Sequence, residues 1–117
     1  MKTKTTILTF NVYADNIERL KSIQGVPAAT LAQQAIRFCA DNNLRINYRA
    51  KAQGARQSLA IRVQSGSPLV EYIFSHLAVA RQSTHKNNML GATLNNMLRA
   101  AAAHGFFEKF EKMEEAA

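Results

Sequence analysis

The chain contains few of the residues that build disulfide frameworks, flexible repeats or membrane spans. Its 117 residues include 1 Cys, 2 Pro and 5 Gly, which excludes a disulfide-stapled secreted domain and a fibrous repeat. Cys39 stands among apolar neighbours and is expected to be a buried, reduced thiol. No apolar run approaches the roughly 20 residues of a membrane span, and the first apolar run is too short for a signal peptide. We therefore expect a cytoplasmic protein that does not contact membranes.

Catalytic and metal-binding patterns are equally sparse. The three His residues have no second Cys or His at zinc-ligand spacing, and Glu71 is the only acid between Asp41 and Glu108. The sequence has neither a Walker-type phosphate loop nor a Gly-rich dinucleotide loop. We therefore expect no catalytic residues, no metal and no cofactor, and predict that the protein is not an enzyme.

Positive charge, by contrast, is abundant and is concentrated in the centre of the chain. Lys and Arg number 15 against 8 Asp and Glu, a formal net charge of +7. Residues 42–70 contain no acid but carry Arg45, Arg49, Lys51, Arg56 and Arg62. Such a surplus is self-repulsive unless a polyanion is the partner, which makes nucleic acid the first hypothesis. A merely basic surface is the competing interpretation.

The first third of the chain has the pattern of a strand followed by two helices. Residues 5–13 alternate, with Leu8, Phe10 and Val12 on one side, which predicts a half-buried strand. Asp15 and Glu18 have capping-box spacing, predicting a helix over 15–23 that ends before Gly25. Pro27 suits the first turn of a second helix, which we expect to reach Asp41.

The same order of elements recurs downstream. Residues 58–64 alternate, with Leu59, Ile61 and Val63 on one side, and helices are predicted over 68–81 and 90–103. Ala-Thr-Leu occurs in both second helices, at 29–31 and 92–94. Internal duplication competes here with a second half that is unrelated to the first. A final amphipathic helix, 106–117, is expected to dock Phe106, Phe110 and Met113 on the body or on a partner.

The first 42 residues resemble the ribbon-helix-helix family of DNA-binding proteins, the MetJ/Arc group. The resemblance lies in the strand and in Gly-Val-Pro-Ala-Ala-Thr-Leu-Ala-Gln-Gln-Ala-Ile at 25–36, where Gly25 takes the turn position and Leu31, Ala35 and Ile36 take the packing positions. Pro27 replaces the hydroxyl residue that caps this helix and touches a phosphate in such proteins. The backbone N–H groups of Ala28 and Ala29 would then have to make that contact alone.

The resemblance implies a mainly α fold with a short antiparallel β-ribbon and, if both halves belong to the family, two β-α-α repeats in one chain. The chain is then similar to tandem ribbon-helix-helix proteins of plasmid conjugation and regulation. A lone strand leaves its backbone groups unpaired, so it must pair with the second strand or with another chain. The expected organisation is a first repeat over 1–44, a basic linker over 45–57, a second, divergent repeat over 58–105 and the tail over 106–117.

The function that this implies is sequence-specific binding of double-stranded DNA, with the ribbon in the major groove. The protein would act as a transcriptional repressor or as an accessory factor in plasmid conjugation, within a relaxosome, or in partition. The expected base contacts are Thr9, Asn11, Ser58, Arg62 and Gln64, with Ile7 or Tyr13 left open. The expected phosphate contacts are Lys2, Lys4, Ala28, Ala29, Arg45, Arg49, Lys51 and Arg56.

The partners expected on this hypothesis are double-stranded DNA, a second copy of the chain on DNA, and a relaxase or another plasmid-transfer protein. Two other classes compete with it. One is a protein–protein adaptor or antitoxin-like module that grips a partner with Phe106, Phe107 and Phe110, DNA binding being secondary. The other, a non-specific nucleic-acid binder, is disfavoured because the strand faces lack aromatic stacking platforms.

Overall fold

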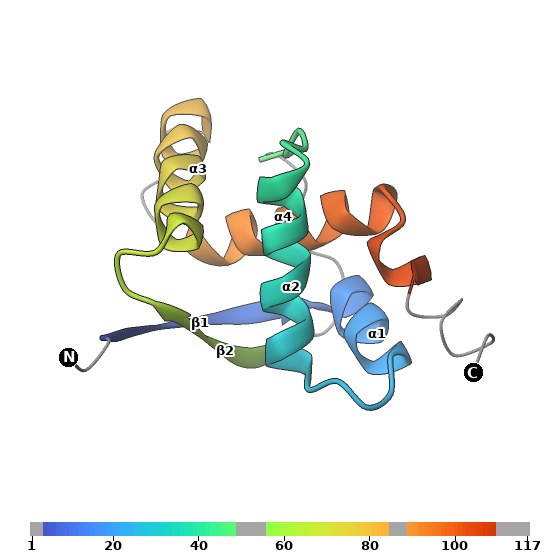
Figure 1. Ribbon diagram of the computed structural model, residues 1–117. Helices are drawn as coiled ribbons and strands as arrows, with labels where there is room; N and C mark the ends of the chain where they lie inside the picture. The colour runs from blue at the N-terminus through green and yellow to red at the C-terminus, as the bar shows by residue number, and fades with distance from the viewer. Residues whose placement is uncertain (1–3, 49–55, 85–88, 110–117) are drawn as a thin grey trace.

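The computed structural model describes residues 4–48, 56–84 and 89–109 and shows a mixed α/β fold. A two-stranded antiparallel ribbon lies along one side of the molecule, and the helices gather on one face of it (Figure 1). Residues 106–109 are also helical. In chain order the elements are β1 (Thr5–Tyr13), α1 (Ala14–Ser22), α2 (Ala28–Asp41), β2 (Arg56–Gln64), α3 (Pro68–Thr84) and α4 (Leu90–Ala103).

The ribbon is formed within a single chain. β1 pairs with β2 along its whole length, so that Thr5 lies opposite Gln64, Thr9 opposite Ala60 and Tyr13 opposite Arg56. The partner of the first strand is therefore the second strand, one of the two alternatives that the sequence left open. β1 has the predicted bounds, whereas β2 begins two residues earlier than predicted.

Alternation along both strands decides which side faces the helices. Leu8, Phe10 and Val12 of β1 are buried, as are Ile61 and Val63 of β2, and Leu59 is half-buried. The predicted inward set is confirmed. Alternation places every second residue on the opposite face, and none of the described helices covers that face (Figure 1).

The helix boundaries are close to those expected, with one correction at the start of α1. That helix begins at Ala14, directly after the strand, and its N-cap Tyr13 makes no side-chain capping bond. The capping box predicted from Asp15 and Glu18 is therefore wrong, because Asp15 already lies inside the first turn. At α3 the prediction holds, since Ser67 Oγ accepts the Val70 N–H at 3.4 Å and Pro68 opens the helix. α3 runs three residues beyond the predicted end.

The core lies where α2 and α4 pack over the inner face of the ribbon. Leu31, Ala35 and Ile36 from α2 meet Leu94 and Met97 from α4, and all five are fully buried. A core of this kind needs both helices, because neither helix alone covers the apolar face of the ribbon.

Cys39 lies inside this core. Its thiol donates to the Met97 carbonyl at 3.1 Å, and burial raises its pKa to about 12. The predicted burial of Cys39 is confirmed.

The aromatic residues after α4 dock on the body. Phe106 and Phe107 are each 7% exposed, and the ring centre of Phe106 lies 5.4 Å from that of Phe38 on α2. Of the two docking modes considered for this segment, the intramolecular one is confirmed for Phe106. Phe110 and Met113 lie outside the described residues. Within the ranges that the structure describes, no helix is long and apolar enough to cross a membrane.

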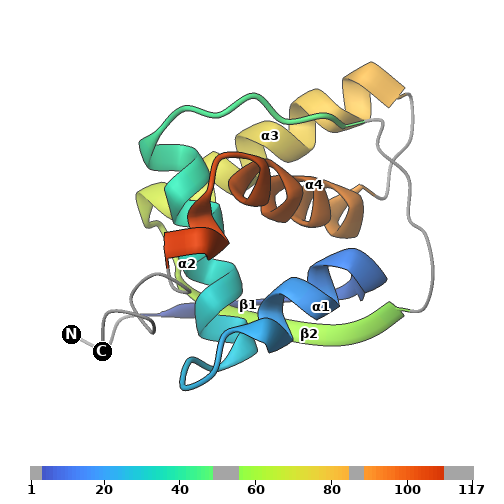
Figure 2. The ribbon, with the colours of Figure 1, turned by 90° about the vertical axis from the view of Figure 1, so that its right-hand side faces the viewer.

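The two halves of the chain have the same order of a strand and two helices, but their helices differ in orientation and length. α2 rises steeply from the ribbon, whereas α4 lies flatter across it (Figures 1 and 2). α3, Pro68–Thr84, is also far longer than α1, Ala14–Ser22. Internal duplication therefore stays a prediction.

A matched pair of glycine substitutions tests the turn that separates α1 from α2. Gly25 has φ +83°, a left-handed conformation, whereas Gly91 lies inside α4 with space for a Cβ, the nearest atom being Phe10 Cβ at 3.8 Å. Gly25→Ala should lower the free energy of unfolding by about 1 kcal/mol. Gly91→Ala should leave it unchanged or raise it by up to about 1 kcal/mol. Urea unfolding of both variants checks this, and equal effects would contradict the turn assignment.

Candidate nucleic-acid interface

The uncovered side of the ribbon presents nine exposed residues, which we call the outer face. None of them is acidic, two are arginines and five have hydroxyl or amide side chains. Such side chains form hydrogen bonds to base edges and phosphates. The outer face consists of Thr5, Ile7, Thr9 and Asn11 from β1 and Arg56, Ser58, Ala60, Arg62 and Gln64 from β2.

The strand register brings the predicted base-contact residues together on this face. Asn11 lies directly opposite Ser58, and Thr5 lies opposite Gln64. Arg62 lies opposite Ile7, next to the central pair of Thr9 and Ala60. All five predicted base contacts are thus exposed on one surface, and their contacts with DNA stay predictions. The short side chains of the central pair allow another surface to approach closely.

The structure separates the two residues that the sequence left open as further base contacts. Ile7 is 57% exposed on the outer face, whereas Tyr13 is 9% exposed. The guanidinium carbons of Arg99 and Arg56 lie 5.0 and 5.8 Å from the centre of the Tyr13 ring. Cation–π contact with both arginines holds Tyr13 against the body, so only Ile7 is available to a ligand.

A buried asparagine on α4, which is not among the predicted site residues, fixes the end of β1. Asn95 is fully buried; its Nδ2 donates to the Asn11 carbonyl at 2.9 Å and its Oδ1 accepts the Tyr13 N–H at 2.8 Å. These two backbone groups belong to the edge of β1 that faces away from β2. The amide of Asn95 therefore bonds this edge as a neighbouring strand would.

The same amide also ties α1 to α4. Asn16 is fully buried and donates through Nδ2 to the Asn95 carbonyl at 3.0 Å and to Asn95 Oδ1 at 3.1 Å. Asn95 Nδ2 further donates to the Gly91 carbonyl at 2.7 Å. The sequence signal for this network was a pair of asparagines, 95 and 96, between the apolar residues Leu94 and Met97 of a helix.

Two ion pairs hold Asp15, an acid in the first turn of α1 just after the end of β1. Asp15 receives hydrogen bonds from Arg99 Nε at 2.9 Å and from Arg19 Nη1 at 3.0 Å. Burial by itself would raise the pKa of Asp15, but the hydrogen bond and charge of Arg99, followed by those of Arg19, outweigh it and hold the pKa below its ordinary value. Two arginines against one carboxylate leave this end of the ribbon positive.

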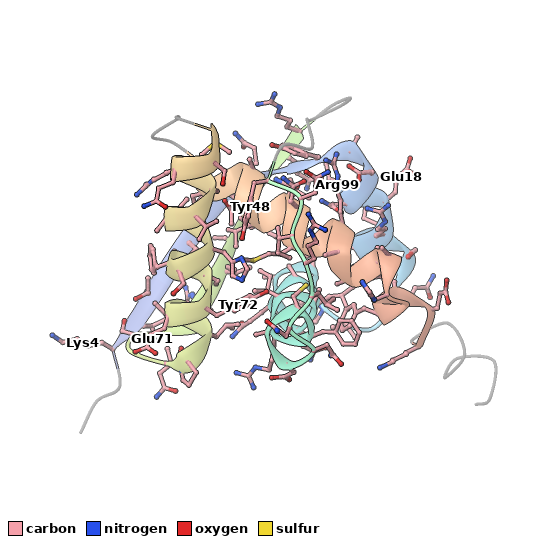
Figure 3. The ribbon with its side chains drawn as sticks, turned by 90° about the horizontal axis from the view of Figure 1, so that it is seen from above. Lys4, Glu18, Tyr48, Glu71, Tyr72 and Arg99 are labelled. Carbon is pink, nitrogen blue, oxygen red and sulfur yellow. The ribbon has the colours of Figure 1, made fainter. Side chains whose placement is uncertain are left out.

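The predicted phosphate contacts are dispersed. Lys4 lies at one end of the ribbon (Figure 3) and Arg56 at the other. The first turn of α2, with Ala28 and Ala29, has no side-chain cap, and Ala28 lines a small apolar pocket together with Ser58 of β2. The N-terminus of α2 thus lies beside the ribbon, with its backbone N–H groups uncapped by side chains. Lys2, Arg49 and Lys51 lie outside the described residues.

Arg45 is not brought to the outer face. It follows the end of α2, a helix of 14 residues that spans about 21 Å from the ribbon side, and the segment that carries it runs along the helix side of the molecule (Figure 2). There it lines a cleft of about 770 Å³ with Tyr48 and His76. The Tyr48 hydroxyl and His76 Nδ1 form a hydrogen bond, and burial lowers the pKa of His76.

Comparison with protein-family models, with curated proteins and with solved structures finds no match to this chain. Within the described part of the chain, no group of three or more His, Cys, Asp or Glu is placed to hold a metal ion. The outer face and the charges around it are therefore the features of the molecule that indicate a function.

Removing the Asn95 amide should strongly destabilise the fold. Asn95→Ala leaves the buried Asn16 amide and the Tyr13 N–H without the acceptor they share, which should lower the free energy of unfolding by about 3 kcal/mol. The control is Asn42→Ala, which removes one exposed bond to the Phe38 carbonyl and should cost about 1 kcal/mol or less. Thermal and urea unfolding measure both, and similar losses would show that the network contributes little.

The Asp15 ion pairs predict a pH-dependent stability. Because the folded-state pKa of Asp15 is lowered, the ionised carboxylate stabilises the fold above its ordinary pKa of 3.8, and this contribution is lost as the pH falls through the lowered value. Asp15→Asn should therefore cost up to about 1 kcal/mol at pH 7, the partly exposed pairs being screened by solvent. The difference from the unmodified protein should shrink below pH 4.

Asp41→Asn is the control for this experiment. It makes the same change at the exposed C-terminal end of α2, where a negative charge is unfavourable, and should leave stability unchanged or slightly higher at pH 7. Urea unfolding from pH 3 to 7 gives both curves. A cost of Asp15→Asn that stays constant over this range would contradict the ion-pair assignment.

Proposed function

We propose that this protein binds double-stranded DNA in a sequence-specific manner and inserts the outer face of its β1–β2 ribbon into the major groove. The observation that carries the proposal is the outer face itself: nine exposed residues without an acid, in fixed register, most of them able to hydrogen-bond to bases. The B-DNA major groove is about 12 Å wide and admits a two-stranded ribbon.

The side chains on this face suit particular bases. Arg62 can bond guanine O6 and N7 together, and Asn11 or Gln64 can bond adenine N6 and N7. The backbone of Asn11 is the most firmly held of the three, because Asn95 bonds both the Asn11 carbonyl and the Tyr13 N–H. Each good bidentate pair discriminates against a wrong base by about 1–3 kcal/mol.

Affinity would come from groups at the margins of the ribbon. Lys4 and Arg56 lie at its two ends, and the uncapped first turn of α2 offers the N–H groups of Ala28 and Ala29 to a phosphate. The carboxylate of Asp15 is paired with Arg99 and Arg19 and adds little repulsion towards a phosphate. These contacts carry no base information, so they would set affinity and salt dependence.

One chain carries both strands of the ribbon, so a monomer offers a complete outer face. We propose on this ground that the chain is a tandem ribbon-helix-helix unit whose two β-α-α halves have diverged, and that a second copy binds beside it on DNA. The biological role is that of a transcriptional repressor or of an accessory factor in plasmid conjugation or partition, where a relaxase or another transfer protein is the further partner.

The competing adaptor hypothesis draws less support. It requires the C-terminal aromatic residues to be available to a partner, whereas Phe106 and Phe107 are buried in the core. Phe110 lies outside the described residues and is the member of that group on which an adaptor would depend.

Two arginine substitutions on the ribbon separate specificity from general affinity. From a random duplex pool the full-length protein should select one preferred sequence. Arg62→Ala should reduce the preference for it over random DNA by about tenfold or more, the loss of one bidentate contact. Arg56→Ala should weaken all duplexes alike and lower the salt slope by about 0.9, the loss of one phosphate contact. Arg45→Ala, which removes the same charge at the far end of α2, is the control and should have little effect.

Fluorescence anisotropy at several salt concentrations measures all three variants. The absence of duplex binding at low salt would refute the proposed function. Equal losses in the three variants would indicate that only total charge matters and that the outer face is not the contact surface.

A further inference from the structure

Ile7 stands out on the outer face because it is large, apolar and exposed. It is 57% exposed, and the other exposed large apolar residues in the described ranges, Phe74 and Val79, lie on α3. The neighbours of Ile7 on the same face are Thr5, Thr9 and, directly opposite, Arg62. A single apolar side chain surrounded by hydrogen-bonding groups does not form the broad apolar patch that a protein partner would cover.

The major-groove edge of DNA has the matching character. It is lined by hydrogen-bond donors and acceptors, and its apolar feature is the 5-methyl group of thymine. We infer that Ile7 packs against the 5-methyl group of a thymine and that this thymine belongs to the base pair next to the guanine bound by Arg62. The inference rests on the proposed function and adds a specific base to it.

The register gives the relation between the two bases. Residues directly opposite in an antiparallel pair have Cβ atoms about 4.5–5.5 Å apart, and successive base pairs are about 3.4 Å apart along the helix axis. Ile7 and Arg62 therefore project towards neighbouring base pairs. A guanine pair contains no thymine, so the methyl group must come from the adjacent pair.

The reach of Ile7 is short, and the residues beside it permit a close approach. Thr9 and Ala60 form the next pair along the ribbon, and both side chains are small. A ribbon with short central side chains can lie deep in the groove, while the longer Arg62 spans the distance to guanine from the same depth. Ile7 could then touch a methyl group without displacing Arg62.

Strand propensity offers another reason for an isoleucine at position 7, because β-branched residues favour strands wherever they point. Ile7→Thr separates the two explanations, since threonine keeps the β-branch and the propensity but presents a hydroxyl and loses apolar area. Val79→Thr makes a similar change at an exposed site on α3 and is the matched control.

The experiment removes the methyl group from the DNA rather than from the protein. In the duplex selected by the full-length protein, each thymine is replaced in turn by deoxyuridine, which lacks only the 5-methyl group. One replacement, next to the guanine that Arg62→Ala ceases to prefer, should weaken binding about fourfold, the effect of losing one methyl-sized apolar contact. In Ile7→Thr the same replacement should change affinity about twofold or less, because threonine keeps one γ-methyl group but lacks the longer ethyl arm of isoleucine. Val79→Thr should keep the fourfold effect.

The outcomes distinguish this inference from the function on which it rests. If the selected duplex depends on Arg62 but every deoxyuridine replacement is neutral, or if the fourfold effect persists undiminished in Ile7→Thr, the methyl contact is refuted and DNA binding stands. A selected site without a thymine next to that guanine also refutes it. If no duplex is selected, both the proposed function and the methyl contact are refuted.

Discussion

The pairing of β1 with β2 is the interaction on which the rest of this structure depends. A two-stranded ribbon has one apolar face to bury, and it is unstable until helices cover that face. The strands come from the two halves of the chain, so pairing them brings α2 and α4 together over the buried Leu8, Phe10 and Ile61. The core between the helices and the exposed outer face are therefore two consequences of a single pairing.

A ribbon covered on one side also has open edges, and a side chain caps the edge of β1 at its C-terminal end. Asn95 supplies one acceptor and one donor to Tyr13 and Asn11, where a third strand would otherwise supply backbone groups. Capping this end of the edge with a side chain from a helix, rather than with a third strand, keeps the ribbon narrow. The major groove admits a ribbon of two strands. The packing of α4 against β1 and the proposed DNA contact therefore both require a ribbon of this width.

The distribution of charge over the surface depends on ion pairs and on the fold as well as on the number of basic residues. Asp15 lies in the first turn of α1 and is held by Arg99 and Arg19, while Arg99 and Arg56 also lie near the Tyr13 ring. These contacts leave an excess of guanidinium groups at one end of the ribbon. Arg45, from the most basic part of the sequence, is carried to the helix side by the length of α2. The described arginines of the basic centre are therefore divided in space: Arg56 and Arg62 lie on the outer face, and Arg45 lies on the helix side.

The sequence by itself determined the secondary structure and the character of each strand face. The bounds of β1 and α4 agree residue for residue with the predicted 5–13 and 90–103, because alternation and helical periodicity are local properties. The predictions were less accurate where the local signal is polar: β2 starts at Arg56, and α3 continues through Gln82 to Thr84. The five expected base contacts lie on the outer face for the same local reason, since alternation alone puts them there.

Only the tertiary structure decided the pairing partner, the register that sets Ile7 opposite Arg62, and the burial of Tyr13. The start of α1 also depended on it, because the predicted capping box is replaced by contacts of Tyr13 and Asp15 with Asn95 and Arg99, residues 82 and 84 positions away. Periodicity extends over a few residues, whereas these contacts form when the core closes and packs α4 on β1. The sequence therefore determined which side chains the ribbon exposes, and the closing of the core decided which of them stand side by side.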